Sequence, residues 1–308
     1  MNVSDALEAA CSEVGLSVPR ASVHGKWLRT DVIATGKRGK GDGEVRIDKW
    51  AVVAKNWQTG KSVVVNLHDG ELTTAQKEQR RRDERAVRER EEAAAAHAAS
   101  IAQEIVTASR QARHPYLIGK GFPNEMPLTV HVDALVPILD RGRKKPDSLI
   151  PDGGRTAIVV PARRGTAITT VQLIWEDGTK RFLAGGALGG ASHRLCRGRD
   201  TWLVEGFATG LSIRAALKGL NRADTVLVCF SAGNVATIAS DLPCYIAAEN
   251  DKPRPEFGGL GTSEHYARLS GRPYVMPPEM GQDFNDLHQS ASIFEVQRRL
   301  AAFLREAK

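Results

Sequence analysis

The sequence lacks any apolar run long enough to cross a bilayer, although its 308 residues can bury a sizeable core. Its opening stretch, MNVSDALEAACSEVGL, also lacks the basic start of a signal peptide. These two absences argue against a membrane-embedded or secreted protein. We therefore expect a soluble protein of the cytoplasm with no membrane partner.

Cysteine is scarce, and its four copies stand far apart without a C-x-x-C pair. That spacing argues against a zinc ribbon and against a disulfide framework. Three of the four lie in or beside apolar runs, where a free thiol packs as a small hydrophobic side chain. The cysteines are Cys11, Cys196, Cys229 and Cys244.

A phosphate-binding loop is also missing, although the stretch KNWQTGKS resembles one. In the pattern G-x-x-x-x-G-K-S, the first glycine would have to stand at the position of Lys55. We therefore expect no ATPase site here and interpret Thr59-Gly60 as the turn of a β-hairpin.

Basic residues outnumber acidic ones, which gives a formal net charge of +7 and an isoelectric point near 9.3. This balance favours a polyanionic partner, although a basic cluster is also commonly a solvated surface loop. The clusters stand mostly beside glycine, in loops that can approach phosphates. They are 37–40, 141–145, 163–164, 180–181 and 193–199.

The pattern of apolar residues divides the chain into four segments and predicts an α/β fold. Residues 1–70 combine one helical stretch with short strands, as in a small α+β domain. Residues 71–113 contain charges of both signs and neither glycine nor proline, which is typical of a long connector helix, and only its second half has apolar residues to dock. Residues 114–200 are β-rich. Residues 201–308 alternate four apolar strands with helices, which is the pattern of a parallel sheet covered on both faces.

Acidic residues follow three of those four strands, at the carboxyl ends where an open parallel sheet forms its functional crevice. They are Glu205, Glu249, Asp251, Asp283 and Asp286. Clustered carboxylates repel one another unless a cation neutralises them, and oxygen ligands suit Mg²⁺ or Mn²⁺. Each acid alone could instead cap a helix or form a turn. Their recurrence at successive strand ends predicts a shared divalent-metal site.

Four stretches, VEGFATGLSI, VLVCFSAGN, YIAAEND and GQDFNDL, resemble in this order the TOPRIM domain of phage- and plasmid-encoded DNA primases. The resemblance extends upstream through HPYLIGKGF and IWEDGTKRFLAGG and, more weakly, to HGKW and NWQTG. It implies a C-terminal TOPRIM domain over residues 201–308, preceded by a β-rich part of the primase core. It also implies an N-terminal domain that binds the template, and a protein of the bacterial host cytoplasm.

In the family that this sequence resembles, a glutamate and an Asp-x-Asp pair act together with a downstream aspartate. The matching positions are Glu205, then Glu249 with Asp251, then Asp283, with Asp286 close behind. The resemblance therefore implies catalytic roles for Glu205, Glu249 and Asp251. Glu249 departs from the pattern, because its carboxylate lies one methylene farther from the backbone than that of aspartate. This departure bears on the geometry of the metal and on full activity.

Two further sets of residues are candidates for binding nucleotides and DNA. Near the expected crevice, side chains that could contact nucleotide phosphates or template are Lys180, Arg181, Arg163, Arg164 and Asn234. For residues 180–181, an exposed hairpin edge is the alternative. In the first segment, indoles among basic residues could stack on unpaired bases or could fill the core of the small sheet. The candidates there are Trp27, Trp50 and Trp57, with Lys37 and Arg38.

The resemblance implies a DNA primase that joins ribonucleoside triphosphates into short RNA primers on single-stranded DNA, with Mg²⁺ or Mn²⁺ as cofactor. Because the phosphate loop is absent, a replicative helicase would be a separate partner. Two alternatives remain open: a TOPRIM-type metal-dependent nuclease, and a catalytically degenerate protein that binds DNA or recruits a helicase. A topoisomerase is disfavoured, since it needs a catalytic tyrosine on a separate cleavage domain and the four tyrosines lie in or beside elements already assigned.

Overall fold

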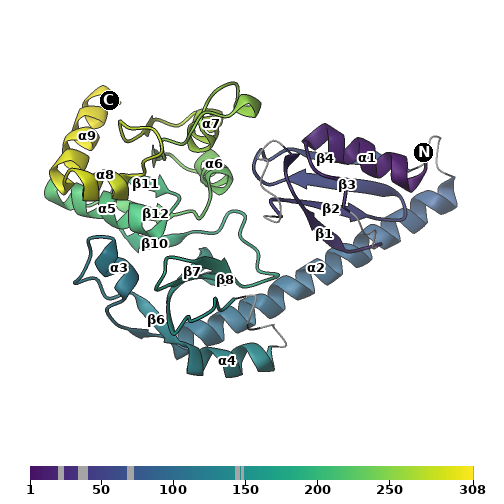
Figure 1. Cartoon of the computed structure of the whole chain (residues 1–308), viewed down its shortest axis with the longest axis horizontal. Coiled ribbons are helices and arrows are strands. Elements are labelled where there is room, and N and C mark those ends of the chain that lie inside the picture. The colour runs from purple at the N-terminus through teal and green to yellow at the C-terminus, as the bar shows by residue number, and fades with distance from the viewer. Residues whose placement is uncertain (20–23, 34–40, 68–72, 143–145, 147–148, 308) are drawn as a thin grey trace. The chain divides into compact units, whose positions relative to one another are not determined.

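The computed structural model describes residues 1–19, 24–33, 41–67, 73–142, 146 and 149–307. The chain is of the mixed α/β class, as the pattern of strands and helices predicts. It forms two compact units, Met1–Glu89 and Arg90–Lys308 (Figure 1).

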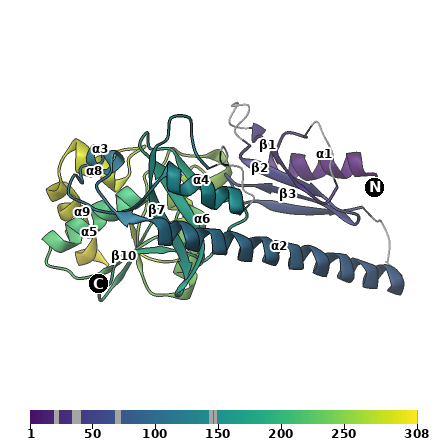
Figure 2. The ribbon, with the colours of Figure 1, turned by 90° about the horizontal axis from the view of Figure 1, so that it is seen from below.

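The first unit is a four-stranded antiparallel sheet with one helix packed on one of its faces (Figure 2). Its elements are α1 (Val3–Val14), β1 (Trp27–Thr30), β2 (Gly43–Ile47), β3 (Ala51–Asn56) and β4 (Ser62–Asn66). Asn2 caps the start of α1, where its side chain accepts a hydrogen bond from the backbone N–H of Asp5. The predicted hairpin turn at Thr59-Gly60 is confirmed, and Gly60 has a φ of 71°, a conformation that favours glycine.

The core of the first unit is aliphatic. Alternate residues of β2 face α1, so Val45 and Ile47 are buried while Arg46 between them lies on the opposite face. The buried cluster consists of Ala6, Leu7, Ala10, Cys11, Val14, Leu16, Val32, Val45, Ile47, Val52 and Ala54. Within the described residues no tryptophan belongs to this cluster, so Trp27 and Trp57 do not fill the core of the small sheet.

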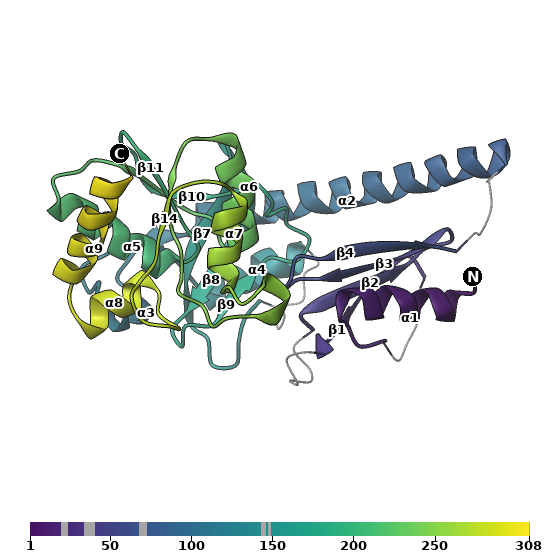
Figure 3. The same cartoon turned by 90° about the horizontal axis from the view of Figure 1, so that it is seen from above.

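Helix α2 (Thr74–Ala108) is the long charged helix that the sequence predicts (Figure 3). Its first part carries the ion pairs Arg80–Glu84 and Arg85–Glu89, each spanning one helical turn. Its second part carries the buried residues Ala98, Ile101, Ala102 and Ile105. The expectation that the second part docks through apolar side chains is therefore confirmed.

The second unit contains two sheets, the first of which is antiparallel with strand order β5-β6-β7-β8-β9. Its strands are β5 (Arg110–Gln111), β6 (Leu128–His131), β7 (Thr156–Arg164), β8 (Ala167–Trp175) and β9 (Lys180–Phe182). The helices in this region are α3 (Pro115–Gly119) and α4 (Val132–Arg141). The sequence did not predict α4, because Pro137 stands inside it and proline ordinarily breaks a helix interior.

The second sheet has the strand order β10-β12-β11-β13-β14. Its strands are β10 (His193–Cys196), β11 (Thr201–Val204), β12 (Thr225–Val228), β13 (Tyr245–Ala247) and β14 (Tyr274–Val275). The last four are parallel to one another, as predicted, and β10 adds an antiparallel edge. The helices are α5 (Phe207–Gly219), α6 (Ala232–Asp241), α7 (Thr262–Leu269), α8 (Phe284–Ser290) and α9 (Ile293–Glu306), with a 3-10 turn, η3, at Pro255–Phe257.

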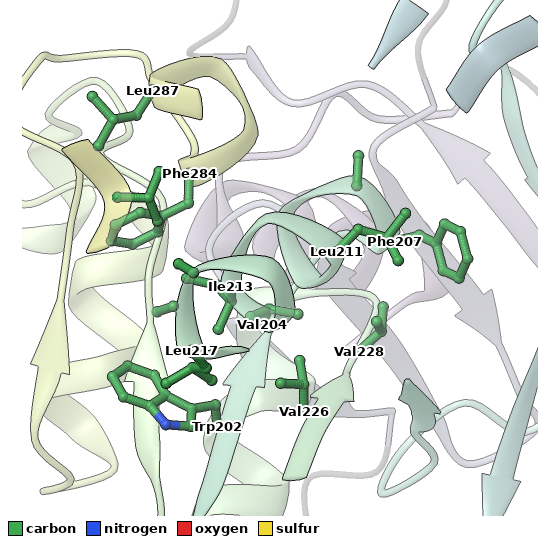
Figure 4. Packing of buried hydrophobic residues seen from close by; sticks show 14 of the residues in the cluster. Trp202, Val204, Phe207, Leu211, Ile213, Leu217, Val226, Val228, Phe284 and Leu287 are labelled. Carbon is green, nitrogen blue, oxygen red and sulfur yellow. The ribbon is translucent and has the colours of Figure 1, made fainter. Parts of the chain in front are cut away.

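Helices cover both faces of this parallel sheet. On one face, Trp202 of β11 and Val226 of β12 pack against Leu217 of α5, with Phe284 of α8 in the same cluster (Figure 4). On the other face, residues of α6 and α7 pack against Leu203 and the ends of neighbouring strands. The sheet is therefore packed on both faces, and its strand ends have fixed positions relative to one another.

The four cysteines are free thiols, three of them buried, in line with their expected packing as small hydrophobic side chains. In the part of the chain that the structure describes, no helix is both long and apolar enough to span a membrane.

Candidate active site

The parallel pairing of β11 with β13 brings their carboxyl ends to one edge of the sheet. Glu205 follows β11 directly, and Glu249 and Asp251 follow β13. The backbone oxygen of Glu205 also accepts a hydrogen bond of 2.9 Å from the N–H of Phe230, which follows β12. The sequence prediction that acids from separate strands meet at this edge agrees with the electrostatics described next.

Glu205 is held in an environment that disfavours its charge. Burial, together with the nearby charges of Asp251 and Asp283, raises the pKa of Glu205 to about 7, although the hydroxyl of Ser263 opposes the shift. That hydroxyl donates a hydrogen bond to Oε1 of Glu205. Near neutral pH this carboxyl is therefore poised between its protonated and ionised forms.

Glu249 shows the same behaviour. Burial, together with the charges of Glu205, Asp283 and Asp251, raises the pKa of Glu249 to about 8. The ammonium of Lys180, on β9 of the other sheet, partly offsets these effects. Four carboxyl groups thus interact electrostatically at one strand edge, and the ammonium of Lys180 on the neighbouring sheet acts on Glu249.

Asp251 is tied to the start of α7. Its Oδ2 accepts a hydrogen bond of 2.9 Å from the backbone N–H of Ser263, in the first turn of that helix. Gly261 permits this approach, because a Cβ at that position would come within 2.6 Å of the Asp251 backbone oxygen. Ser263 is therefore the link between two of the acids, donating its N–H to Asp251 and its hydroxyl to Glu205.

Asp283 and Asp286 form a capping box at the start of α8. Asp283 Oδ1 accepts from the backbone N–H of Asp286 at 2.8 Å, and Asp286 Oδ2 accepts from the N–H of Asp283 at 3.1 Å. The second oxygen of Asp283 accepts from the hydroxyl of Thr209 on α5 at 3.0 Å. The helix-capping alternative is thus shown for this pair, while ligation of a metal remains a prediction. A carboxylate oxygen that caps a helix retains lone pairs for a cation.

The donor set fits a hard divalent cation in its chemistry. Glu205, Glu249, Asp251 and Asp283 offer only carboxylate oxygens, which Mg²⁺ and Mn²⁺ prefer, and their mutual repulsion falls when a cation lies between them. Among the residues that the structure describes, no three His, Cys, Asp or Glu side chains are already arranged as a ligand set.

A pocket of about 440 Å³ lies beside this edge and carries two lysines. Its lining consists of Pro115, Tyr116, Gly119, Lys120, Glu176, Asp177, Gly178 and Lys180. Burial raises the pKa of Tyr116 to about 12, and the charges of Asp283 and Asp286 contribute, so the pocket borders the acidic edge. The side-chain amide of Asn285 on α8 donates to the Lys120 backbone oxygen at 3.0 Å and fixes that loop against the helix.

The predicted nucleotide-binding residues on strands lie in two places, on β9 and at the end of β7. Lys180 is exposed and acts on Glu249, and Arg181 follows it on β9. Arg163 and Arg164 lie at the end of β7, where each donates a hydrogen bond to a backbone oxygen, of Thr166 and Gly189 respectively.

Asn234 is buried, and its side chain serves the fold. Its amide nitrogen donates to the backbone oxygens of Ala191 at 2.8 Å and Cys229 at 2.7 Å, and its oxygen accepts from the N–H of Gly190 at 2.6 Å. These bonds hold the loop before β10 against the end of β12.

In the first unit, Trp27 and Trp57 lie on or beside the sheet face opposite α1, each with a cation over its ring. Trp50 is buried, and its Nε1 donates to Asp83 at 2.9 Å. Lys37 and Arg38, the other predicted DNA-binding residues, lie outside the described residues.

Sequence reasoning missed three residues of this site. Ser263 gave no signal, because its partners lie 58 and 12 residues away in the chain. Lys120 stands in the quoted stretch HPYLIGKGF, whose lysine could have been paired with Lys180. Phe230 has a φ of 72°, a left-handed conformation that is uncommon outside glycine and that often marks functional loops.

A comparison of this sequence with protein-family models finds no match.

Proposed function

We propose that the chain is a DNA primase of the TOPRIM type, which joins ribonucleotides into short RNA primers on a single-stranded DNA template. The observation that carries the proposal is the set of interacting carboxyl groups at the ends of β11 and β13, in which Glu205 and Glu249 have pKa values raised to about 7 and about 8. Strongly shifted acids that cluster beside a pocket are typical of a reaction centre.

In this reaction the 3′-hydroxyl oxygen of the primer attacks the α-phosphorus of the next ribonucleoside triphosphate. The bond between that phosphorus and pyrophosphate breaks, and the hydroxyl proton leaves. Glu205 is suited to accept the proton, because a carboxyl whose pKa lies near the working pH is an effective base.

Glu249, Asp251 and Asp283 would hold Mg²⁺ or Mn²⁺, with Asp286 beside them, and such an ion supplies charge neutralisation and Lewis acidity to phosphoryl transfer. The chain's own cations complement the acids. Lys120 and Lys180 line the adjacent pocket, where their ammonium groups suit the negative phosphates of a nucleotide.

The test is primer synthesis from labelled ribonucleotides on single-stranded DNA, measured on a gel with each metal. Wild type should make short RNA, and Glu205→Gln should lose at least about 100-fold in rate, because it removes an acid–base group worth that much. The matched control is Glu92→Gln, an exposed glutamate of α2 whose loss should change the rate little.

The alternatives give different results in the same assay. Cleavage of the DNA strand without RNA synthesis would indicate a nuclease that uses the same carboxylates. If Glu205→Gln made primers at a near-normal rate, the assignment of the reaction centre to these carboxylates would be wrong. Binding of DNA without either reaction, in both metals, would indicate a catalytically degenerate protein.

A further inference from the structure

The segment that follows α3 is held by side chains of α8, a helix that covers the other sheet of the second unit. Gln289 donates from its side-chain amide to the backbone oxygen of Gly119 at 2.6 Å. Asn285 donates in the same way to the backbone oxygen of Lys120 at 3.0 Å. Two consecutive carbonyl groups are thus bound by two side chains that lie one helical turn apart on α8.

Two further contacts fix the residues after Lys120. The rings of Phe122 and His288 meet edge to face, with their centroids 5.3 Å apart. Arg214 of α5 donates to the carboxylate of Glu125 at 2.5 Å, and both side chains are about two-thirds shielded from water. The backbone around Lys120 is therefore positioned by α8 and α5, although it belongs to a different part of the chain.

Asn285 is the centre of this arrangement. It is fully buried, and the nitrogen of its side chain also donates to the hydroxyl of Ser212 on α5 at 3.1 Å. Its backbone N–H donates to Oδ1 of Asp283 at 2.6 Å. One residue thus connects the backbone of Lys120 to the cap that holds an acid of the candidate site. Because water does not compete for a buried hydrogen bond, this connection fixes the distance between the two groups well.

The start of α3 is fixed as well, on the side of β7. Nδ1 of the buried His114 accepts from the backbone N–H of Tyr116 at 3.3 Å, and its Nε2 lies 3.1 Å from the backbone oxygen of Thr156. With both ends of α3 held, the flexible stem of Lys120 starts from a fixed point beside the pocket that it lines with Lys180. A lysine so anchored loses less freedom when its ammonium binds an anion.

We propose that Asn285 is a positioning residue, which sets the place of Lys120, and through it of a nucleoside triphosphate, relative to the acid at Asp283. The inference rests on the proposed function for the role of Lys120 as a phosphate ligand. Asn285 is buried, so it acts through the Lys120 backbone and not by touching the nucleotide. Removing its side chain should free the Lys120 backbone and thereby weaken the binding of the triphosphate.

The experiment is isothermal titration calorimetry of the full-length protein, in Mg²⁺, with the α,β-methylene analogue of ATP, whose α–β link does not break. Lys120→Ala should weaken binding about tenfold, as expected for one lost hydrogen bond to a charged group. Asn285→Ala should weaken it about three- to fivefold. In the Lys120→Ala background the same Asn285→Ala change should alter the affinity by less than about twofold, because the lysine through which it acts is gone.

Two controls separate positioning from stability. Gln289→Ala removes an exposed side chain that holds the neighbouring carbonyl, so it should keep the fold and weaken binding about twofold in the same lysine-dependent way. Asn56→Ala removes a buried asparagine of the first unit that also donates to a backbone oxygen, of Val14 at 2.8 Å. It should lower the thermal midpoint and leave the affinity for the analogue unchanged.

Equal losses for Asn285→Ala with and without Lys120 would overturn the proposal, since the asparagine would then only support the fold. Wild-type affinity in both Asn285→Ala and Gln289→Ala, with thermal midpoints near that of wild type, would overturn it too. Primer synthesis tests the proposed function separately. If wild type bound the analogue in this lysine-dependent way but made no RNA, the proposed reaction would be wrong and the role of Asn285 would stand.

Discussion

The two charged regions of the molecule hold like charges together in opposite ways. At the ends of β11 and β13, Glu205 and Glu249 are withdrawn from water, and the pKa of each carboxyl is raised. On the sheet of the first unit, Lys55 and Arg29 lie against indole rings and remain in contact with water. The acids reduce their repulsion by keeping protons, whereas the cations reduce theirs by hydration and by ion pairs, of Lys55 with Glu44 and of Arg46 with Asp48.

The difference between buried acids and exposed cations determines how each region can respond to a ligand. Buried acids near their pKa release protons when a cation arrives, so binding there is coupled to pH and to the stability of the fold. Exposed cations stay charged throughout the physiological range and exchange only small counterions when a polyanion binds. The charge of the first region therefore changes when a cation binds, whereas the charge of the second does not.

The largest effect that tests this comparison is on stability. With its pKa raised to about 7, Glu205 keeps a proton in the folded state that it releases in the unfolded state, so its contribution to stability falls as pH rises from its ordinary value of 4.5 to about 7. Glu205→Gln removes that penalty. It should raise the free energy of unfolding of metal-free protein by on the order of 2–3 kcal/mol above about pH 8 and change it little near pH 4.

Urea unfolding at both pH values measures this gain, with Glu92→Gln as the exposed control that should show none. Equal gains at the two pH values would mean that packing, and not charge, is responsible. Added Mg²⁺ should stabilise wild type more than Glu205→Gln at the higher pH, because the ion replaces the missing protons.

Much of the fold could be predicted because local signals agreed with the tertiary structure. Apolar runs bounded by glycine and charged residues marked β11 to β14, and Thr59-Gly60 marked a hairpin. Helix α4 was not predicted, since Pro137 stands inside it, although in the structure the helix buries Leu135, Ile138 and Leu139. There tertiary packing overrides the local preference of the chain.

The sequence predicts the part of the candidate site that lies directly at the ends of the strands. Glu205 and Glu249 stand directly after apolar runs, and parallel pairing brings them to one edge. The bridge through Ser263 depends on where α7 docks, which no local pattern encodes. Likewise, Trp50 and Trp57 have similar basic neighbours in the sequence, yet one is buried and the other exposed, because the turn after β3 directs only the second outward.

A smaller effect concerns the side-chain length of Glu249. If the crevice accommodates the longer acid only in part, wild type should synthesise primers comparatively better with Mn²⁺ than with Mg²⁺, because Mg²⁺ demands near-ideal octahedral geometry. Glu249→Asp should then raise the Mg²⁺ rate by about two- to tenfold, a gain of roughly 1 kcal/mol. Primer synthesis in each metal measures it, and Glu249→Gln, which should fail in both, is the control.

Strong Mg²⁺ activity in wild type that collapses in Glu249→Asp would contradict this prediction. It would mean that the site is built around the longer glutamate, with the ammonium of Lys180 placed to suit it.

The smallest effect is expected on the exposed side of the comparison. Lys55→Met removes a cation whose side chain is 43% exposed and keeps an apolar stem against Trp27. Because a cation over an indole at an exposed site is worth about 0.5–1 kcal/mol and methionine recovers part of it, the free energy of unfolding should fall by no more than about 0.5 kcal/mol. The same urea series measures the change. A loss above about 1.5 kcal/mol would show that these cations contribute substantially to the stability of the sheet, and the contrast with the acids, which destabilise the fold when ionised, would be sharper than expected from an exposed pair.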